Sequence, residues 1–218
     1  MQRWPRCAAC SQGRSLLAPG RQMSLLNAVH QLCARLGHLV VKPSPMSITL
    51  SSASLPVFKT ALANLAHCLK KAEANAAARQ FSPEVLVGLR LAPDMLPLAS
   101  QVRIACDAAK NGAARVSGLT APKFADDETT LAQLQERIAK TLAWLDALPA
   151  DAFDGREEHD VTFPVGKEAT RTMKAEAYLK HWAIPNVFFH VTTAYALLRQ
   201  AGVDLGKADF LAGAQASA

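Results

Sequence analysis

His190 is the residue of this chain whose surroundings point most clearly to chemistry. It lies in residues 178–210, YLKHWAIPNVFFHVTTAYALLRQAGVDLGKADF, a pattern that predicts a long helix with apolar neighbours around one histidine. Asn186 precedes it by one turn, so at about 100° per residue the two side chains lie about 40° apart, close enough to share a binding partner. His181 falls on the opposite side of an unbroken helix. The pair to consider is therefore Asn186 with His190.

Pro185 lies immediately before Asn186 and has no N–H to give to the carbonyl of the preceding turn. A proline inside a helix costs about 3 kcal/mol unless packing supports the bend. The simpler interpretation is a structural kink around a bulky core of Trp182, Phe188 and Phe189. The sharper one is that the bend opens a pocket beside His190.

The polar residues also have ordinary structural interpretations. His190 could be a buried histidine whose hydrogen bonds are satisfied within the core. Asn186 could bond the backbone carbonyl that the proline leaves free. A buried imidazole without any partner would cost about 1–3 kcal/mol. We therefore expect a polar side chain within hydrogen-bond distance of His190.

The composition favours helices and a reducing compartment. Of 218 residues, 50% are hydrophobic but only 6% aromatic, and the abundant Ala and Leu are strong helix formers. Five cysteines give no even disulfide framework, which predicts a cytoplasmic protein. Cys68 and Cys106 are expected to fill the core. No window approaches the roughly 20 apolar residues that span a membrane.

The net charge of +6 belongs to the N-terminal arm. Residues 1–45 hold six Lys and Arg and no acid, whereas residues 46–218 hold 18 basic and 18 acidic residues. A nucleic-acid-binding surface would need a basic stripe on this second part, and its charge totals show none. The arm could be a targeting segment, a disordered or weakly helical arm, or an overlong start upstream of Met46. Its Cys7-x-x-Cys10 pair lacks a second pair at zinc spacing and is a weak metal signal.

Apolar residues recur at helical spacing in three further segments. They step by three and four residues, the heptad spacing of helices that pack along a seam. The three seams are Leu55, Phe58, Leu62, Leu65, Leu69, Ala72 and Ala76; Leu98, Val102, Ala105, Ala109, Gly112 and Val116; and Leu131, Leu134, Ile138, Leu142, Leu145 and Leu148.

The remaining pattern predicts connections. Residues 122–128, PKFADDE, are expected to cap the third helix, and residues 161–171, with Pro164 and Gly166 at their centre, predict a short β-hairpin. Four helices with one apolar face each pack most simply as an antiparallel-type bundle. The long third connection leaves room for a crossover. The sequence thus predicts an all-α, four-helix bundle in residues 46–218, with a hairpin before the last helix.

Several separated blocks resemble one known family, in order. The blocks HVTTAYALLRQAGVDLGKADFL, LAPDMLPLASQVRIACDAAK and PKFADDETTLAQLQERIAKTLAWL resemble the bacterial family called domain of unknown function 1993, which belongs to the DinB-like/YfiT-like four-helix bundles. The resemblance covers about residues 46–212. It implies Met46 as the natural start, and residues 1–45 have no counterpart in the family.

The superfamily is known for metal sites of three histidines, one on the second helix and two at i, i+4 on the last. Placed on that pattern, His190 matches the second ligand of the pair, Asn186 the first, and Gln101 lies near the second-helix ligand. The resemblance therefore implies that two imidazoles are replaced by carboxamides, which bind zinc or nickel poorly. We expect at most a weakly bound divalent metal on His190, and we assign no cofactor.

Two classes of function follow. The first is a small-ligand-binding or structural bundle, expected to be a homodimer, whose degenerate metal site of His190, Asn186 and Gln101 holds a small polar ligand or water. The second is a DinB-like metal- or thiol-dependent transferase or hydrolase that uses His190. Only one of the three implied metal-ligand positions is a histidine, and this favours the first class. The chain contains no Ser-His-Asp order, glycine-rich phosphate loop or paired carboxylates to indicate another enzyme, so its catalytic residues and its substrate are unknown.

Overall fold

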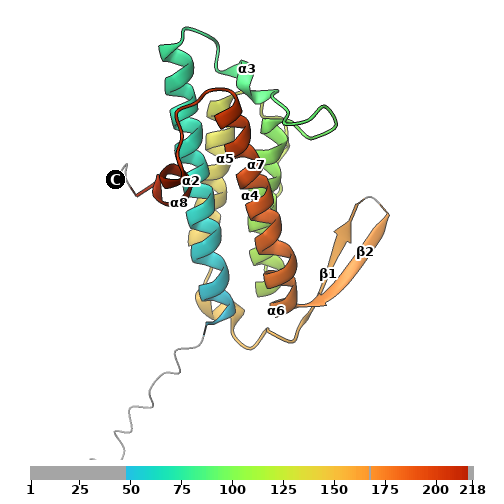
Figure 1. Cartoon of the computed structure of the whole chain (residues 1–218). Coiled ribbons are helices and arrows are strands. Elements are labelled where there is room, and N and C mark those ends of the chain that lie inside the picture. The colour runs from blue at the N-terminus through green and yellow to red at the C-terminus, as the bar shows by residue number, and fades with distance from the viewer. Residues whose placement is uncertain (1–47, 167, 216–218) are drawn as a thin grey trace, which may run out of the picture. The chain divides into compact units, whose positions relative to one another are not determined.

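The computed structural model describes residues 48–166 and 168–215 (Figure 1). The predicted behaviour of residues 1–45, including the Cys7-x-x-Cys10 pair, lies outside this range. Four long helices form the bundle: α2 (Leu50–Ala78), α4 (Leu98–Ser117), α5 (Leu131–Asp146) and α7 (Ile184–Gln200). Short α3 (Glu84–Val87) and the 3₁₀ turn η1 (Ala150–Phe153) lie in the connections. Within the described residues, no helix is both long and apolar enough to cross a membrane. The predicted helical bundle is confirmed.

The directions of the helices differ from a simple antiparallel bundle. Arg103, early in α4, bonds Glu128 just before α5, so these two helices start at the same end and run parallel. Arg115, near the end of α4, bonds Tyr178 before α7, so α4 and α7 are antiparallel. The crossover is therefore the connection 118–130, not the later one that we expected. Thirteen extended residues reach about 43 Å, enough to return along a helix of about 30 Å.

Two of the helices begin with a capping box, in which a threonine side chain and a residue three positions later bond each other's backbone N–H groups. Thr49 and Ser52 do this for α2, and Thr130 and Gln133 for α5. The expectation that the acidic segment 122–128 caps α5 is therefore wrong. Its carboxylates bind arginines instead, because the crossover lays this segment beside buried cations.

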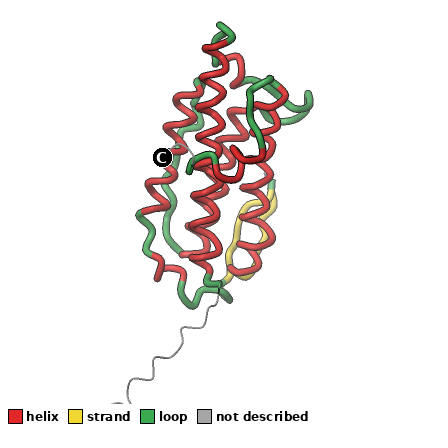
Figure 2. The backbone as a smooth tube through the Cα atoms, turned by 60° about the vertical axis from the view of Figure 1, so that its left-hand side comes forward, coloured by secondary structure: helices red, strands yellow, loops and turns green. Residues whose placement is uncertain are grey.

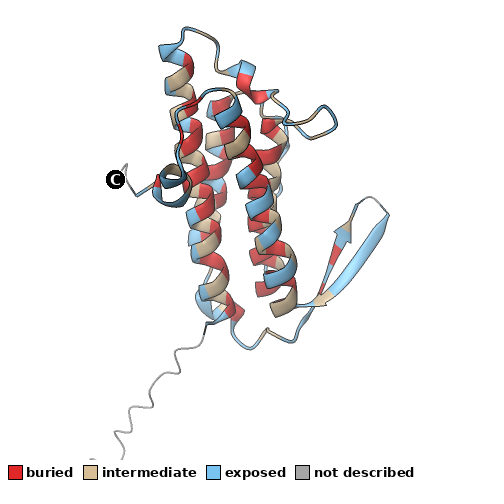
Figure 3. Cartoon of the chain, viewed as in Figure 1, coloured by how far each residue is buried: buried red, intermediate tan, exposed pale blue. Residues whose placement is uncertain are grey.

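The predicted seams form the core (Figure 3). Every seam residue of α2 and α4 is buried, and in the third seam only Leu142 and Leu148 are partly exposed. The predicted bulky core around the proline is wrong for two of its residues. Phe188 is 37% exposed and Phe189 is 57% exposed. These two side chains form an apolar surface on α7. A count of apolar residues along a helix cannot distinguish such a surface from a core.

The segment that leads into α7 is not one continuous α-helix. Short α6 (Ala175–Tyr178) is followed by a π-helical turn, η2 (Leu179–Ala183), before α7 begins at Ile184. Pro185 thus lies in the first turn of α7, where a missing N–H costs little. The proposed mid-helix kink is replaced by a π turn, a common way to absorb such a disruption.

The predicted hairpin is present. Strand β1 (Asp160–Val165) pairs antiparallel with β2 (Ala169–Lys174), and the two strands are a small addition to an otherwise helical fold (Figure 2). Phe163 of β1 is buried, with its ring centroid 4.8 Å from that of Tyr178 and 4.9 Å from that of Trp182. The hairpin is therefore anchored to the start of the last helical segment.

A last short helix, α8 (Lys207–Ala212), packs on α2 (Figure 1). Asp209 binds His67 at 2.8 Å and Lys71 at 3.2 Å. Asn64, buried in α2, donates to the carbonyl of Phe210 at 2.9 Å and accepts from the backbone of Ala214 at 3.0 Å. These bonds hold α8 against α2.

Candidate functional site

His190 and Gln101 form one buried pair. His190 is in the second turn of α7 and Gln101 is in the first turn of α4, and the antiparallel packing of these helices brings the two side chains together. His190 Nδ1 lies 2.7 Å from Gln101 Oε1, and the residues are 8% and 2% exposed. The predicted contact between His190 and a partner from the second long helix is confirmed.

The hydrogen bonds of Gln101 determine the tautomer of His190. Gln101 Nε2 donates to the backbone carbonyl of Leu96 at 3.0 Å, which turns Oε1 toward the imidazole. A carboxamide oxygen can only accept, so Nδ1 of His190 must carry the proton. In the neutral ring, Nε2 is then an unprotonated acceptor.

The environment of His190 keeps the ring neutral. Burial lowers the pKa of His190 from its ordinary value of 6.5, because an imidazolium loses hydration in the core. No described side chain or backbone group bonds Nε2. The lone pair of Nε2 is therefore available to accept a hydrogen bond from a ligand.

Asn186 is near this pair but is not joined to it. It lies in the first turn of α7 and is half-buried. Within the described part of the chain, its side chain makes no hydrogen bond, either to His190 or to a backbone carbonyl. The expected bond to a carbonyl freed by Pro185 is therefore absent, because the π turn precedes the proline. A ligand-binding role for Asn186 stays a prediction.

The donor set does not fit the three-ligand metal site that the superfamily suggests. Gln101 Oε1 accepts from Nδ1 of His190, whereas a metal would bind at Nε2 on the other edge of the ring. Gln101 can therefore not ligate that metal while it holds the imidazole. In the described ranges, no three His, Cys, Asp or Glu residues cluster as metal ligands would. Gln101 takes the place of the group that orients a histidine ring rather than of a ligand.

A charged cluster that the sequence did not predict ties the crossover to the bundle. Arg137 of α5 is only 2% exposed, and it binds Asp107 at 3.0 Å, Asp126 at 2.7 Å and Glu128 at 2.8 Å. Burial raises the pKa of Glu128, but its hydrogen bonds from Arg137 and Arg103 outweigh this and leave the pKa below 4.5. The signal in the sequence was the acidic run 126–128, which we interpreted as a cap.

Phe124 of the crossover completes this cluster. The ammonium of Lys110 lies 4.2 Å from the centre of the Phe124 ring, and the guanidinium of Arg137 lies 4.9 Å from it. Lys110 also donates to the carbonyl of Pro122 at 2.6 Å. These cations are thus engaged by carboxylates, a carbonyl and an aromatic face. The cluster thus fastens residues 122–128 to α4 and α5.

The two described cysteines are unsuited to nucleophilic chemistry. Cys68 and Cys106 are free and buried. Burial raises the pKa of the Cys68 thiol to about 11 and that of the Cys106 thiol to about 12. A thiol with so high a pKa is not a thiolate near pH 7, as expected for residues that fill the core.

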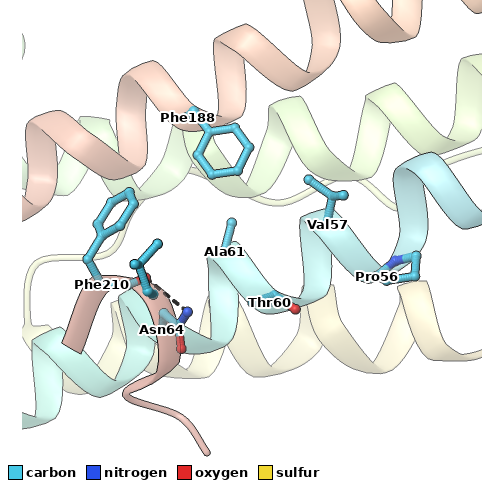
Figure 4. Close-up of a pocket in the computed structure, with 8 residues that line it drawn as sticks. Pro56, Val57, Thr60, Ala61, Asn64, Phe188 and Phe210 are labelled. Atoms are coloured by element: carbon cyan, nitrogen blue, oxygen red, sulfur yellow. Dashed lines mark hydrogen bonds between the residues drawn. The ribbon is translucent and has the colours of Figure 1, made fainter. Parts of the chain in front are cut away.

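An apolar cavity of about 310 Å³ opens between α2, α7 and α8 (Figure 4). His190 and Gln101 are not part of its wall. The sequence did not predict this cavity, because the part of its wall formed by α8 depends on a contact between segments that are far apart in the sequence. Its lining residues are Pro56, Val57, Thr60, Ala61, Asn64, Phe188, Phe210 and Leu211.

Comparison with known proteins gives a consistent family and fold. The family described as "Domain of unknown function (DUF1993)" matches residues 50–211. A solved structure of a DinB family member protein from Shewanella denitrificans is 40% identical, with a TM-score of 0.70, over 74% of this chain and 91% of that chain. No curated protein matches. The similar structure supports the helical bundle, and neither of these two matches names an activity.

Proposed function

This chain belongs to the domain of unknown function 1993 family, within the DinB-like superfamily, and we propose that it is a binding bundle whose degenerate metal site holds a small polar ligand at His190. The observation that carries the proposal is the bond from His190 Nδ1 to Gln101 Oε1 at 2.7 Å. It leaves Nε2 as a fixed acceptor, with Asn186 one turn away.

The chemistry of the site determines the kind of ligand. A neutral imidazole accepts one hydrogen bond at Nε2, so the ligand must bring an N–H or O–H donor. The unpaired carboxamide of Asn186 can both donate and accept. A small amide, alcohol or similar neutral molecule meets both requirements, whereas an anion would face an uncharged ring that offers it no proton at Nε2.

The proposal includes a homodimer in the cytoplasm. The free, buried thiols of Cys68 and Cys106 suit a reducing compartment, and Phe188 and Phe189 are exposed aromatic residues of a kind enriched at interfaces. The protein would then be a paired bundle with one polar site in each protomer.

A hydrolase or transferase is the second candidate, and one observation favours it. A histidine held through Nδ1–H with Nε2 free is arranged as a general base. The buried thiols and the unsuitable donor set speak against a thiol- or metal-dependent version. A general-base enzyme would need a nucleophile or water beside Nε2, which the described residues do not identify.

Acetamide and N,N-dimethylacetamide form a matched pair of probes for the ligand site. Acetamide has N–H groups for Nε2 of His190, and its dimethyl derivative has none. So small a ligand binds weakly, in about the millimolar range. We expect acetamide, and not the dimethyl compound, to shift the Nε2 resonance of His190 in ¹⁵N NMR spectra.

The Gln101→Leu variant is the control, because it releases the ring and should weaken this response. Equal shifts from the two probes, or none from either, would count against a donor-binding site.

A further inference from the structure

The first two thirds of α2 and most of α7 carry almost no charge. From Ile184 to Leu198, α7 has no Asp, Glu, Lys or Arg, although 19% of the chain is charged. In α2 the stretch Leu50–Leu69 has Lys59 as its one Lys or Arg and no acid. Lys59 binds Asp146 of α5 at 2.9 Å, so its charge is directed to another helix. Low charge with exposed aromatic residues is typical of the core of a protein interface.

This surface has a hollow and a projection. In Figure 4, Phe188 of α7 and Phe210 of α8 face Val57 and Ala61 of α2 across the cavity of about 310 Å³. Phe189 leaves α7 about 100° further round than Phe188 and is 57% exposed. A closed apolar cavity of about 150 Å³ already holds benzene, so this one has room for a phenylalanine ring.

A second copy of the chain fits this surface on grounds of charge and shape. In a two-fold pair the same patch meets itself, so any net charge on the patch would face its own sign. The near-neutral face of α2 and α7 avoids that repulsion. In a two-fold pair, a projection on the patch must meet a hollow on the same patch, and this patch has both.

We propose that two protomers associate through the face formed by residues 53–64 of α2 and 184–196 of α7, with Phe189 of one protomer in the cavity of the other. This inference rests on the homodimer in the proposed function and names its interface. The stretch of α7 is about 18 Å long. With α2 about 10 Å away and each helix about 10 Å in diameter, the face is about 20 Å wide and covers roughly 400 Å². Specific interfaces bury about 800 Å² per partner, so the dimer should be weak and dissociate on dilution.

Two substitutions test the face from its two sides. Phe189→Asp replaces the projection with a charge, and Thr60→Glu places a charge at the rim of the cavity, where Thr60 is exposed. Val85→Asp is the matched control, because Val85 is 63% exposed on α3, away from the face. Thermal unfolding of each variant is measured first, to check that the fold is retained.

Sedimentation of the full chain over a range of concentrations measures the dimer. The mass of wild type and Val85→Asp should rise from 23.3 kDa toward twice that value, and both test variants should raise the dissociation constant at least tenfold. If either test variant dimerises as readily as wild type, the proposed face is wrong and the homodimer stands. If wild type stays monomeric at every concentration, the homodimer itself is wrong.

Discussion

Replacing Glu128 with glutamine should destabilise the bundle far more than the same change at an exposed site. Glu128 Oε1 lies 2.8 Å from Arg137 Nη1, and Oε2 lies 2.8 Å from Arg103 Nε. Hydrogen bonds to charged groups are worth about 1.5–3 kcal/mol each, against about 0.5–1.5 for neutral ones. Glutamine keeps one oxygen, so one bond weakens and the other is lost. Arg137 keeps two other carboxylate partners. We therefore expect the free energy of unfolding to fall by about 2–3 kcal/mol, which is less than the cost of leaving a buried charge without any partner.

Chemical denaturation at neutral pH measures this loss, with Glu136→Gln as the matched control. Glu136 is 63% exposed and pairs with Lys140 at 2.8 Å, so its loss should cost about 0.2–0.5 kcal/mol. For a domain of this size, the Glu128 variant should also melt roughly 4–12 °C lower.

The pH dependence gives a second check. The pKa of Glu128 is lower in the folded protein than the ordinary value of 4.5, so its contribution is present above about pH 4.5 and is lost as the pH falls through the folded value. The difference in the free energy of unfolding between wild type and Glu128→Gln should therefore become smaller in acid. Equal effects of the Glu128 and Glu136 substitutions, or a difference that becomes larger in acid, would refute the reasoning.

Three further outcomes are expected. Deleting residues 1–45 should change the thermal midpoint by a few degrees at most, because the seams of the bundle begin at Leu55; loss of cooperative unfolding would show that the arm belongs to the core. Protein purified without chelator or affinity-tag nickel should carry well under one equivalent of zinc, nickel or manganese, and stoichiometric metal that disappears in His190→Ala would contradict this. The thiols of Cys68 and Cys106 should react with a thiol reagent only after unfolding, since burial raises their pKa values to about 11 and 12; rapid reaction of the native protein would disprove their burial.

The seams of α2 and α4 were predictable because burial repeats with the period of the helix. Leu62 or Val102 needs no knowledge of distant contacts to be assigned to the core. The hairpin was predictable for a similar local reason, since Pro164 and Gly166 interrupt the helical pattern. The direction of α5 was not predictable, because the pattern of apolar residues along a helix is the same whether the helix runs parallel or antiparallel to its neighbour.

The candidate site was predictable in part. The contact of His190 with Gln101 followed from the family resemblance and from the cost of an unpaired buried imidazole. The role of Gln101 did not follow, because it depends on the carbonyl of Leu96, which turns the carboxamide oxygen toward Nδ1. The buried Arg137 was missed for the same kind of reason, because two of its partners come from the crossover. Neither the acidic residues of the crossover nor the charges of α5, taken alone, show that the two segments are in contact.

The state of the His190 ring is the central claim, and ¹⁵N NMR of the imidazole over a pH titration tests it most directly. We predict that Nδ1 carries the proton in the neutral ring, that Nε2 is the free acceptor, and that the pKa lies below 6.5, as burial requires. Gln101→Leu should remove the preference for this tautomer. A proton on Nε2 in the neutral wild-type ring, or a pKa at or above 6.5, would contradict the assignment of His190 as an acceptor held by Gln101.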